Sequence, residues 1–229
     1  MDGYFGDKKW YSNNYSESLD NIEKILLNNI DETKKLVHYF NKIALDLKSH
    51  IEGWEIIYIR DNYSPEFKEV SLKKAILNQL ASFAEEFNEL RIKIKFSEHF
   101  SEESSVTLDK KLFCLVMYNF FSNVLKYSMP NEEIRFNYDE QTKNLDISMY
   151  STKIEKEEME QIFQDGVRGL NANNVSSSGN GLGLFVIKRA LELMGFKNMY
   201  ISPQYAKTKL FDEVTFIENH FRFEFKAND

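Results

Sequence analysis

The chain has 229 residues, and 29 Lys and Arg against 36 Asp and Glu give a net charge of −7. A mildly acidic chain with no basic tract is a poor candidate for binding the phosphate backbone of nucleic acids. The single cysteine, Cys114, excludes an internal disulfide framework and a metal site built from several cysteines. The longest apolar run, Leu112–Tyr118, is too short to span a membrane, and no signal peptide is evident, so we expect a cytoplasmic protein.

The N-terminal part divides into two predicted regions. Residues 1–16 show no periodicity, and we expect them to be disordered, whereas residues 17–64 have a helical pattern. Spacings that alternate between four and three residues are typical of a coiled-coil seam. The seam positions are Ile22, Leu26, Asn29, Thr33, Leu36, Phe40, Ile43 and Leu47. This pattern predicts one long helix over 17–60, or a hairpin broken near Asn28-Asn29, and favours pairing with a second copy of the chain.

Residues 65–229 read as one domain of alternating helices and strands. The predicted helices are Ser71–Leu90 with Ser71 as its cap, Asp109–Tyr127, Ile154–Phe163, and Leu182–Met194 followed by Gly195. The predicted strands are 91–96, 133–138, 144–150, 199–202, 213–217 and 221–225. Helices combined with mostly antiparallel strands predict a layered α+β fold.

Polar residues interrupt the apolar helix predicted at Asp109–Tyr127. Asn119 and Asn123 lie four residues apart, and Lys126 and Tyr127 follow one turn later, so that all four share one face. Burying an unpaired amide costs a few kcal/mol, on the order of 2. The face is therefore either a structural hydrogen-bonding pair of asparagines or the lining of a ligand pocket.

Glycine is concentrated before the last predicted helix. Five of the nine glycines fall within 18 residues: Gly166, Gly169, Gly179, Gly181 and Gly183. Glycines at a helix N-terminus let backbone amides approach a phosphate, although such a run alone is equally typical of a flexible linker. The run has neither the lysine of a P-loop nor the preceding strand of a dinucleotide fingerprint.

Together these two segments resemble the ATP-binding domain of sensor histidine kinases, in the GHKL superfamily. Asp109–Ser128 is similar to the N box, Ile162–Gly169 to the F box and the start of the ATP lid, and Gly179–Leu184 to the second glycine box. Order and spacing agree over residues 67–227. The resemblance implies a two-layer α/β sandwich of the Bergerat type, with dimerisation helices where residues 20–62 lie.

The resemblance also implies a site for ATP or ADP with Mg²⁺. Asn123 would supply an oxygen to Mg²⁺, which otherwise takes water and phosphate oxygens. Arg168 would move with the lid toward the terminal phosphate, and Tyr127 would cover the adenine. The remaining implied nucleotide-binding residues are Asn119, Lys126, Gly166, Gly179, Gly181, Leu182, Gly183 and Leu184.

Two positions distinguish branches of the superfamily. Hydrolytic members carry a glutamate general base where this chain has Asn119, which disfavours an ATP-hydrolysing machine and favours a histidine kinase. The aspartate that bonds the adenine amine is replaced by Met149, and Asp146 would lie on the opposite face of its strand. Loss of a charged hydrogen bond costs about 1.5–3 kcal/mol, so we expect Met149 to weaken base recognition roughly 10–150-fold.

A phosphate acceptor is not evident. None of the four histidines is followed by the acidic residue that the family's phosphorylated histidine has. His38 is the candidate acceptor, because its place between seam positions points it outward, but Tyr39 follows it. The plain alternative is a solvated surface histidine.

The sequence thus favours the ATP-binding core of a two-component histidine kinase that transfers the terminal phosphate to a histidine. The alternative is a non-catalytic, kinase-like signalling or phosphotransfer module, which Met149 and the missing acceptor favour. The expected partners are a second copy of the chain and a response regulator or a protein that carries the histidine.

Overall fold

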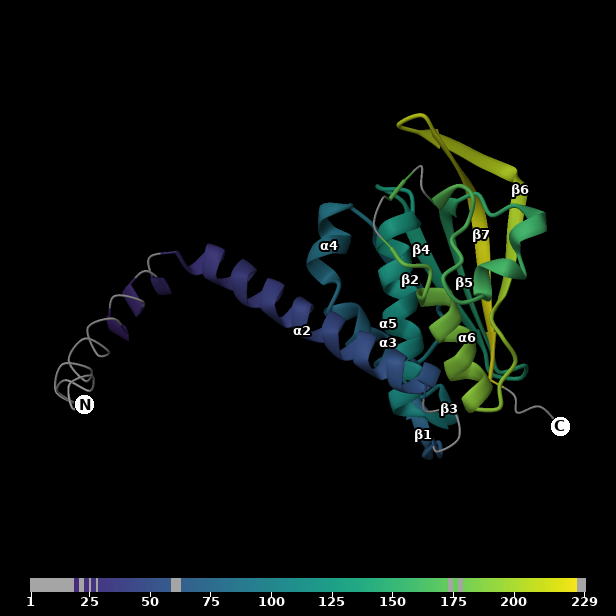
Figure 1. Ribbon diagram of the computed structural model, residues 1–229, viewed down its shortest axis with the longest axis horizontal. Helices are drawn as coiled ribbons and strands as arrows, with labels where there is room; N and C mark the ends of the chain where they lie inside the picture. Colours follow the sequence, from purple (N-terminus) through teal and green to yellow (C-terminus); the bar gives the residue numbers. More distant parts are fainter. Residues whose placement is uncertain are drawn as a thin grey trace, which may run out of the picture. The chain divides into compact units, whose positions relative to one another are not determined.

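A computed structural model describes residues 19–20, 23–24, 26–27, 29–58, 63–172, 175–176 and 179–225. The chain forms two compact units, residues 1–48 and residues 49–229, which are described separately. Figure 1 shows the course of the chain through the labelled elements. The predicted disorder of residues 1–16 lies outside the described residues.

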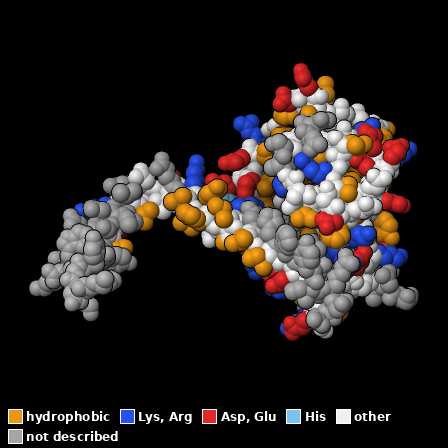
Figure 2. All heavy atoms as spheres, viewed as in Figure 1, with side chains coloured by type: hydrophobic (Ala, Val, Ile, Leu, Met, Phe, Trp, Pro, Cys, Tyr) orange, Lys and Arg blue, Asp and Glu red, His pale blue; other side chains and the backbone are white. Residues whose placement is uncertain are grey.

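The first unit contains most of a long helix, α2 (Ile30–Tyr58). It begins immediately after Asn29, which lies in a turn next to the predicted alternative break. Four of the seam side chains, Leu36, Phe40, Ile43 and Leu47, are between 44% and 61% exposed. Figure 2 shows hydrophobic side chains gathered on this helix. An apolar seam on an exposed helix face is the arrangement that a second helix covers in a coiled coil.

The second unit is built on a five-stranded sheet with the strand order β2-β4-β5-β7-β6. Only the β2–β4 pair is parallel. The strands are β2 (Lys93–Phe96), β4 (Glu133–Asp139), β5 (Asn144–Thr152), β6 (Tyr200–Phe211) and β7 (Val214–Glu224). A separate antiparallel pair is formed by β1 (Phe67–Ser71) and β3 (Ser105–Asp109).

Helices cover one face of this sheet and complete a two-layer α+β sandwich, as predicted. The helices are α3 (Leu72–Ala81), α4 (Ala84–Glu89), α5 (Lys110–Tyr127) and α6 (Gly183–Leu193). α5 and α6 pack side by side (Figure 1). The core lies between α5 and the sheet, where the Phe120 ring contacts those of Phe221 and Phe223 at centroid distances of 5.3 and 5.7 Å. Aromatic burial of this kind contributes most of the free energy that holds the layers together.

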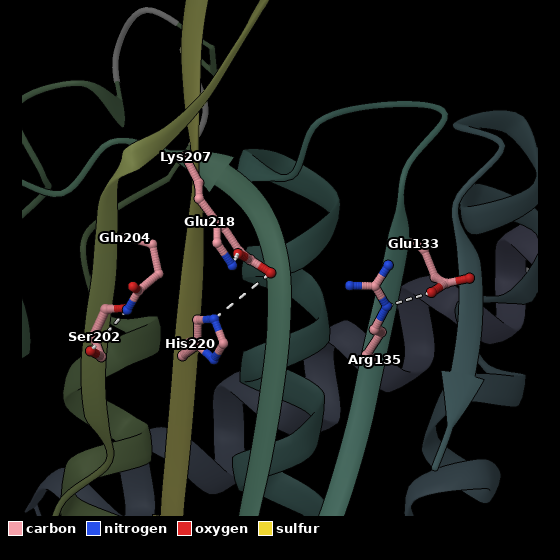
Figure 3. Close-up of polar contacts among 7 residues, drawn as sticks. All are labelled: Glu133, Arg135, Ser202, Gln204, Lys207, Glu218 and His220. Atoms are coloured by element: carbon pink, nitrogen blue, oxygen red, sulfur yellow. Dashed lines mark hydrogen bonds and ion pairs between the residues drawn. The ribbon is translucent and has the colours of Figure 1, made fainter. Parts of the chain in front are cut away.

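The other face of the sheet carries charged and polar side chains. Figure 3 shows Arg135 paired with Glu133 at 2.6 Å, and Lys207 and His220 both directed at Glu218. Asp146 lies on this face and is paired with Arg222 at 2.8 Å. The pairs made by the exposed Arg135 and Arg222 add little to stability, so the sheet is held mainly by its covered face.

The predicted helix over 71–90 is wrong, because it is two helices broken at Ser82-Phe83. Phe83 leaves the helical conformation at φ −119° and is fully buried. Its ring centroid lies 5.1 Å from that of Tyr118 and 5.8 Å from that of Phe121, both in α5. Ser71 precedes α3 as predicted, but its hydroxyl donates to the carbonyl of Glu102 instead of capping the helix.

Two further segments differ from the prediction. Residues 154–163 form two short 3-10 turns, Lys156–Glu158 and Gln161–Phe163, instead of a helix. The three short strands predicted near the C-terminus are two long strands, β6 and β7. Asp212 and Glu213 join them, both with positive φ, which is the geometry of a tight hairpin turn.

Asp109 fastens α5 to the segment before β1. Its carboxylate caps α5 by accepting from the Leu112 amide at 3.0 Å, and also accepts from the Glu66 amide at 2.8 Å and the Tyr63 hydroxyl at 3.0 Å. Burial alone would raise the pKa of Asp109, but these hydrogen bonds outweigh it and lower the pKa. Burial and the bond to Asp109 raise the pKa of Tyr63 to about 12.

We therefore expect Asp109→Ala to destabilise the protein by about 3 kcal/mol at neutral pH. Because the folded-state pKa of Asp109 is depressed, its contribution is complete above about pH 4 and is lost as the pH falls through the lowered value. Urea unfolding of both proteins should show the difference shrinking below pH 4. Glu89→Ala, at an exposed carboxylate, is the control; an equal loss there would contradict the capping role.

Candidate functional site

The candidate site lies where the polar face of α5 meets the loop that precedes α6. Asn119, Asn123, Lys126 and Tyr127 are all half-buried on α5, among neighbours that are mostly fully buried. Asp109 begins this helix and fixes its register, since capping selects one start. The predicted polar face of α5 therefore exists.

Asn123 lies against the first residue of α6. A Cβ added to Gly183 would come within 3.0 Å of both Nδ2 and Oδ1 of Asn123. Such a contact is tighter than most real Cβ contacts, so a larger residue at Gly183 would require the Asn123 side chain to shift by a few tenths of an ångström. The free backbone amides of a helix N-terminus favour an anion. Here they lie beside the amide oxygen of Asn123, which is neutral and can act as a metal ligand.

The two glycine-containing segments pack backbone against backbone. Gly181 has φ +72°, and a Cβ there would lie 2.5 Å from the Gly166 carbonyl carbon and 2.7 Å from the oxygens of Gly166 and Val167. Gly166 has nearly the same φ, +73°, but open space around it. The two glycines thus share a backbone conformation that would strain any L residue placed there, and they differ only in the crowding around the added side chain.

This contrast predicts different costs for the same substitution. We expect Gly166→Ala to destabilise the protein by about 1 kcal/mol, from the positive φ alone. Gly181→Ala should cost about 2 kcal/mol more, because the methyl group displaces the opposing backbone. Thermal unfolding of the two variants measures the difference, and equal losses would mean that the loop does not dock as described.

Arg168 and Tyr127 meet at Gly179. A Cβ on Gly179 would lie 3.5 Å from the Tyr127 hydroxyl and 3.9 Å from Arg168 Nε. The Arg168 guanidinium donates through Nη2 to the Ser176 carbonyl at 2.7 Å, and its Nε is buried with no partner among the described residues. A partly satisfied guanidinium beside a glycine-rich loop is available to an anion that enters there.

Asn119 is used differently from Asn123. Its Nδ2 donates to the Leu115 carbonyl at 2.9 Å and to Ser49 Oγ at 3.4 Å. These bonds hold the nitrogen side of the Asn119 amide to the backbone of its own helix and to Ser49. The remaining candidate positions, Leu182 and Leu184, flank Gly183 at the start of α6.

Met149 lies in β5 and faces the helices, with 5% of its surface exposed. Further along the chain, Ser151 is also buried, and Lys153 pairs with Glu155 at 2.9 Å. Asp146 lies on the opposite face of β5, as predicted, and cannot replace the missing carboxylate.

His38 lies in the first unit, on α2. Its side chain is half-buried, whereas the seam count predicts an outward and exposed ring, so that detail is wrong. Tyr39, the residue in the place of the acidic neighbour, is 61% exposed.

The sequence did not reveal Glu158, which anchors the segment at Gly169 and Leu170. Its carboxylate is buried, accepts from the Leu170 amide at 2.6 Å and from the Glu155 amide at 2.8 Å, and faces Gly169. The only available signal was the spacing of Glu155 and Glu158, which fits a capping box. A second residue that the sequence did not reveal, Asn219, is buried in β7 opposite Met149.

Within the described part of the chain, no group of three or more His, Cys, Asp or Glu side chains could hold a metal ion. None of the described helices is long and apolar enough to cross a membrane.

Sequence comparison finds relatives among bacterial sensor kinases. The signal transduction histidine-protein kinase ArlS of Staphylococcus haemolyticus is 26% identical over 133 residues, 57% of this chain and 28% of that protein. The sensor protein SrrB of Staphylococcus aureus is 25% identical over 179 residues, 77% of this chain and 29% of that protein. The chain therefore spans less than a third of the length of either relative.

Solved structures show the same fold. The nucleotide-free catalytic domain of histidine kinase ThkA matches with a TM-score of 0.52 and 20% identity, over 70% of this chain and 98% of that one. The mycobacterial sensor histidine kinase MprB matches with a TM-score of 0.51 and 16% identity, over 71% of this chain and 100% of that one. The model of the histidine kinase-, DNA gyrase B- and HSP90-like ATPase family matches residues 108–226, just over half of the chain. The chain belongs to this family.

Proposed function

We propose that this chain is the ATP-binding catalytic part of a two-component histidine kinase and transfers the terminal phosphoryl group of ATP to a histidine. Domains of its family bind ATP. The observation that carries the proposal is the approach of Asn123 to the first residue of α6, with Tyr127 and Arg168 meeting at Gly179 in the same loop. These are the residues that the family resemblance assigns to the nucleotide.

In this proposal the Asn123 amide oxygen faces the phosphates beside the N-terminus of α6 and is the protein's ligand for Mg²⁺. A bound Mg²⁺ would neutralise phosphate charge, and it accepts neutral oxygen ligands together with water and phosphate oxygens. Lys126 and the amides of the Gly179–Gly183 segment hold the phosphates. Arg168 turns from the Ser176 carbonyl toward the terminal phosphate, and Tyr127 covers the base.

Asn119 supports a histidine as the acceptor. Its amide is bonded to the α5 backbone and to Ser49, and an amide cannot serve as a general base toward water or a serine hydroxyl. An imidazole is a stronger nucleophile at neutral pH and needs less activation. Transfer to histidine is thus the reaction that this residue best accommodates.

The proposal extends to assembly. The exposed seam of α2 is suited to a second copy of the chain, which gives a homodimer through the helical region at 17–64, while residues 65–229 form the ATP-binding domain. The proposed partner is a response regulator or a protein that carries the phosphorylated histidine. The proposed compartment is the cytoplasm.

Met149 favours one second candidate, a regulatory module that binds nucleotide weakly and transfers nothing. A buried thioether in β5 cannot accept the hydrogen bond from the adenine amine that the family's aspartate accepts. The two candidates share the nucleotide site and differ in the fate of the terminal phosphate. An acid-labile label from radiolabelled ATP, on this chain or on a histidine-bearing partner, separates the kinase from the regulatory module.

Limited proteolysis tests the nucleotide site itself. We expect saturating ATP with Mg²⁺ to slow tryptic cleavage after Arg168, because the guanidinium and the lid would be held by the phosphates. The same nucleotide concentration should protect Asn123→Ala, the matched control, much less. Cleavage of the wild-type chain at the same rate with and without nucleotide would contradict the proposed function.

A further inference from the structure

Asn219 is a fully buried amide in the centre of β7. It is paired directly with Met149 of β5, and its side chain has no exposed surface. Residues paired across antiparallel strands project from the same face, so both side chains point toward the helices. The other inward positions of β7 are apolar: Ile217, Phe221 and Phe223. An asparagine among them costs stability unless its polar atoms are bonded.

Only the nitrogen side of this amide is bonded. Asn219 Nδ2 donates to Ser151 Oγ at 2.7 Å and to the Thr152 carbonyl at 3.2 Å. Since a carbonyl can only accept, the amide nitrogen must face Thr152, which fixes the orientation of the group. Oδ1 is buried and has no partner within the described residues. An unpaired buried acceptor costs about 1–3 kcal/mol, which a ligand with a donor would remove.

A second unpaired polar atom belongs to the same neighbourhood. Ser128 follows the last residue of α5, Tyr127, and forms an isolated β-bridge with Ser151, the residue that Asn219 bonds. Its Oγ is buried and likewise lacks a partner in the part of the chain that the structure describes. An acceptor and a hydroxyl donor are therefore available where the resemblance places the base.

We propose, on the basis of the proposed function, that Asn219 replaces the missing aspartate as the residue that reads adenine. Its Oδ1 accepts from the exocyclic amine, and the Ser128 hydroxyl donates to the neighbouring ring nitrogen. Adenine presents this donor beside this acceptor, whereas hypoxanthine and guanine present an oxo acceptor beside an N–H donor. The Met149 side chain yields to admit the base, which a flexible thioether does at low cost.

The test compares dissociation constants of three triphosphates by calorimetry on the full chain with Mg²⁺. ATP carries the amine, purine riboside triphosphate lacks it, and inosine triphosphate has the oxo group. We expect the wild type to bind ATP about tenfold more tightly than either analogue. Asn219→Val should bind ATP and purine riboside triphosphate alike, because only the contact with the amine is lost. His220→Gln, at the next residue on the opposite face, should keep the preference.

The outcomes separate this inference from the proposed function. If the wild type binds none of the triphosphates, the proposed function is wrong and the inference with it. If it binds ATP and the analogues equally, the nucleotide site stands and the role of Asn219 is wrong. A preference for ATP over purine riboside triphosphate that survives in folded Asn219→Val also overturns the role. Should that variant fail to fold, Asn219→Ser, which has a shorter side chain and a hydroxyl, gives the same comparison.

Discussion

Asn123→Ala is expected to abolish the Mg²⁺-dependent part of nucleotide binding and to leave the fold intact. The amide is half-buried against Gly183, and its removal deletes the one side-chain oxygen proposed as a metal ligand. Loss of an interaction with a charged group amounts to about 1.5–3 kcal/mol, so affinity should fall roughly 10–150-fold. Calorimetry with Mg-ATP measures the change.

The control for Asn123→Ala is Asn137→Ala, at an exposed asparagine on β4. Thermal unfolding of both variants shows whether the loss is local. Unchanged affinity of Asn123→Ala for Mg-ATP would mean that α5 is not the N box.

The second large effect concerns phosphotransfer. We expect autophosphorylation of this chain alone to be absent or very slow. His38 is half-buried and followed by Tyr39, so it lacks an acidic neighbour to orient the ring and take its proton. General-base assistance is typically worth about 10²–10⁴-fold in rate. Radiolabelled ATP followed by acid treatment detects phosphohistidine through its acid lability.

His38→Gln is the decisive variant in that assay. Rapid labelling of the wild type that disappears in His38→Gln would overturn the expectation and make the chain a self-sufficient kinase. Rapid labelling that persists in the variant would assign the acceptor to another histidine, of which His50 is the next candidate on the same helix.

The elements with a strong local pattern could be predicted from the sequence. α5 has the predicted bounds because Asp109 caps it and its apolar face is continuous. The break at Phe83 could not be predicted, since it depends on the rings of Tyr118 and Phe121 in another helix. Strands β1 and β3 could not be predicted, because both are short and β1 is exposed over most of its length.

The candidate site divides in the same way. Residues within the two motifs, such as Asn123 and Gly183, could be found because their spacing along the chain is the signal. Asn219 could not, because its importance depends on the pairing of β7 with β5 and on a bond to Ser151, 68 residues away. Glu158 is similar, since its partner Leu170 is 12 residues away in the sequence.

The most direct test of the nucleotide site is the affinity of the wild-type chain for ATP with Mg²⁺ and with excess chelator. The juxtaposition of Asn123 with the N-terminus of α6 predicts measurable binding with Mg²⁺. It also predicts a fall of at least about tenfold when the metal is removed, because the phosphates would lose both the ion and its protein ligand. No binding in either condition, or the same affinity in both, would contradict the assignment.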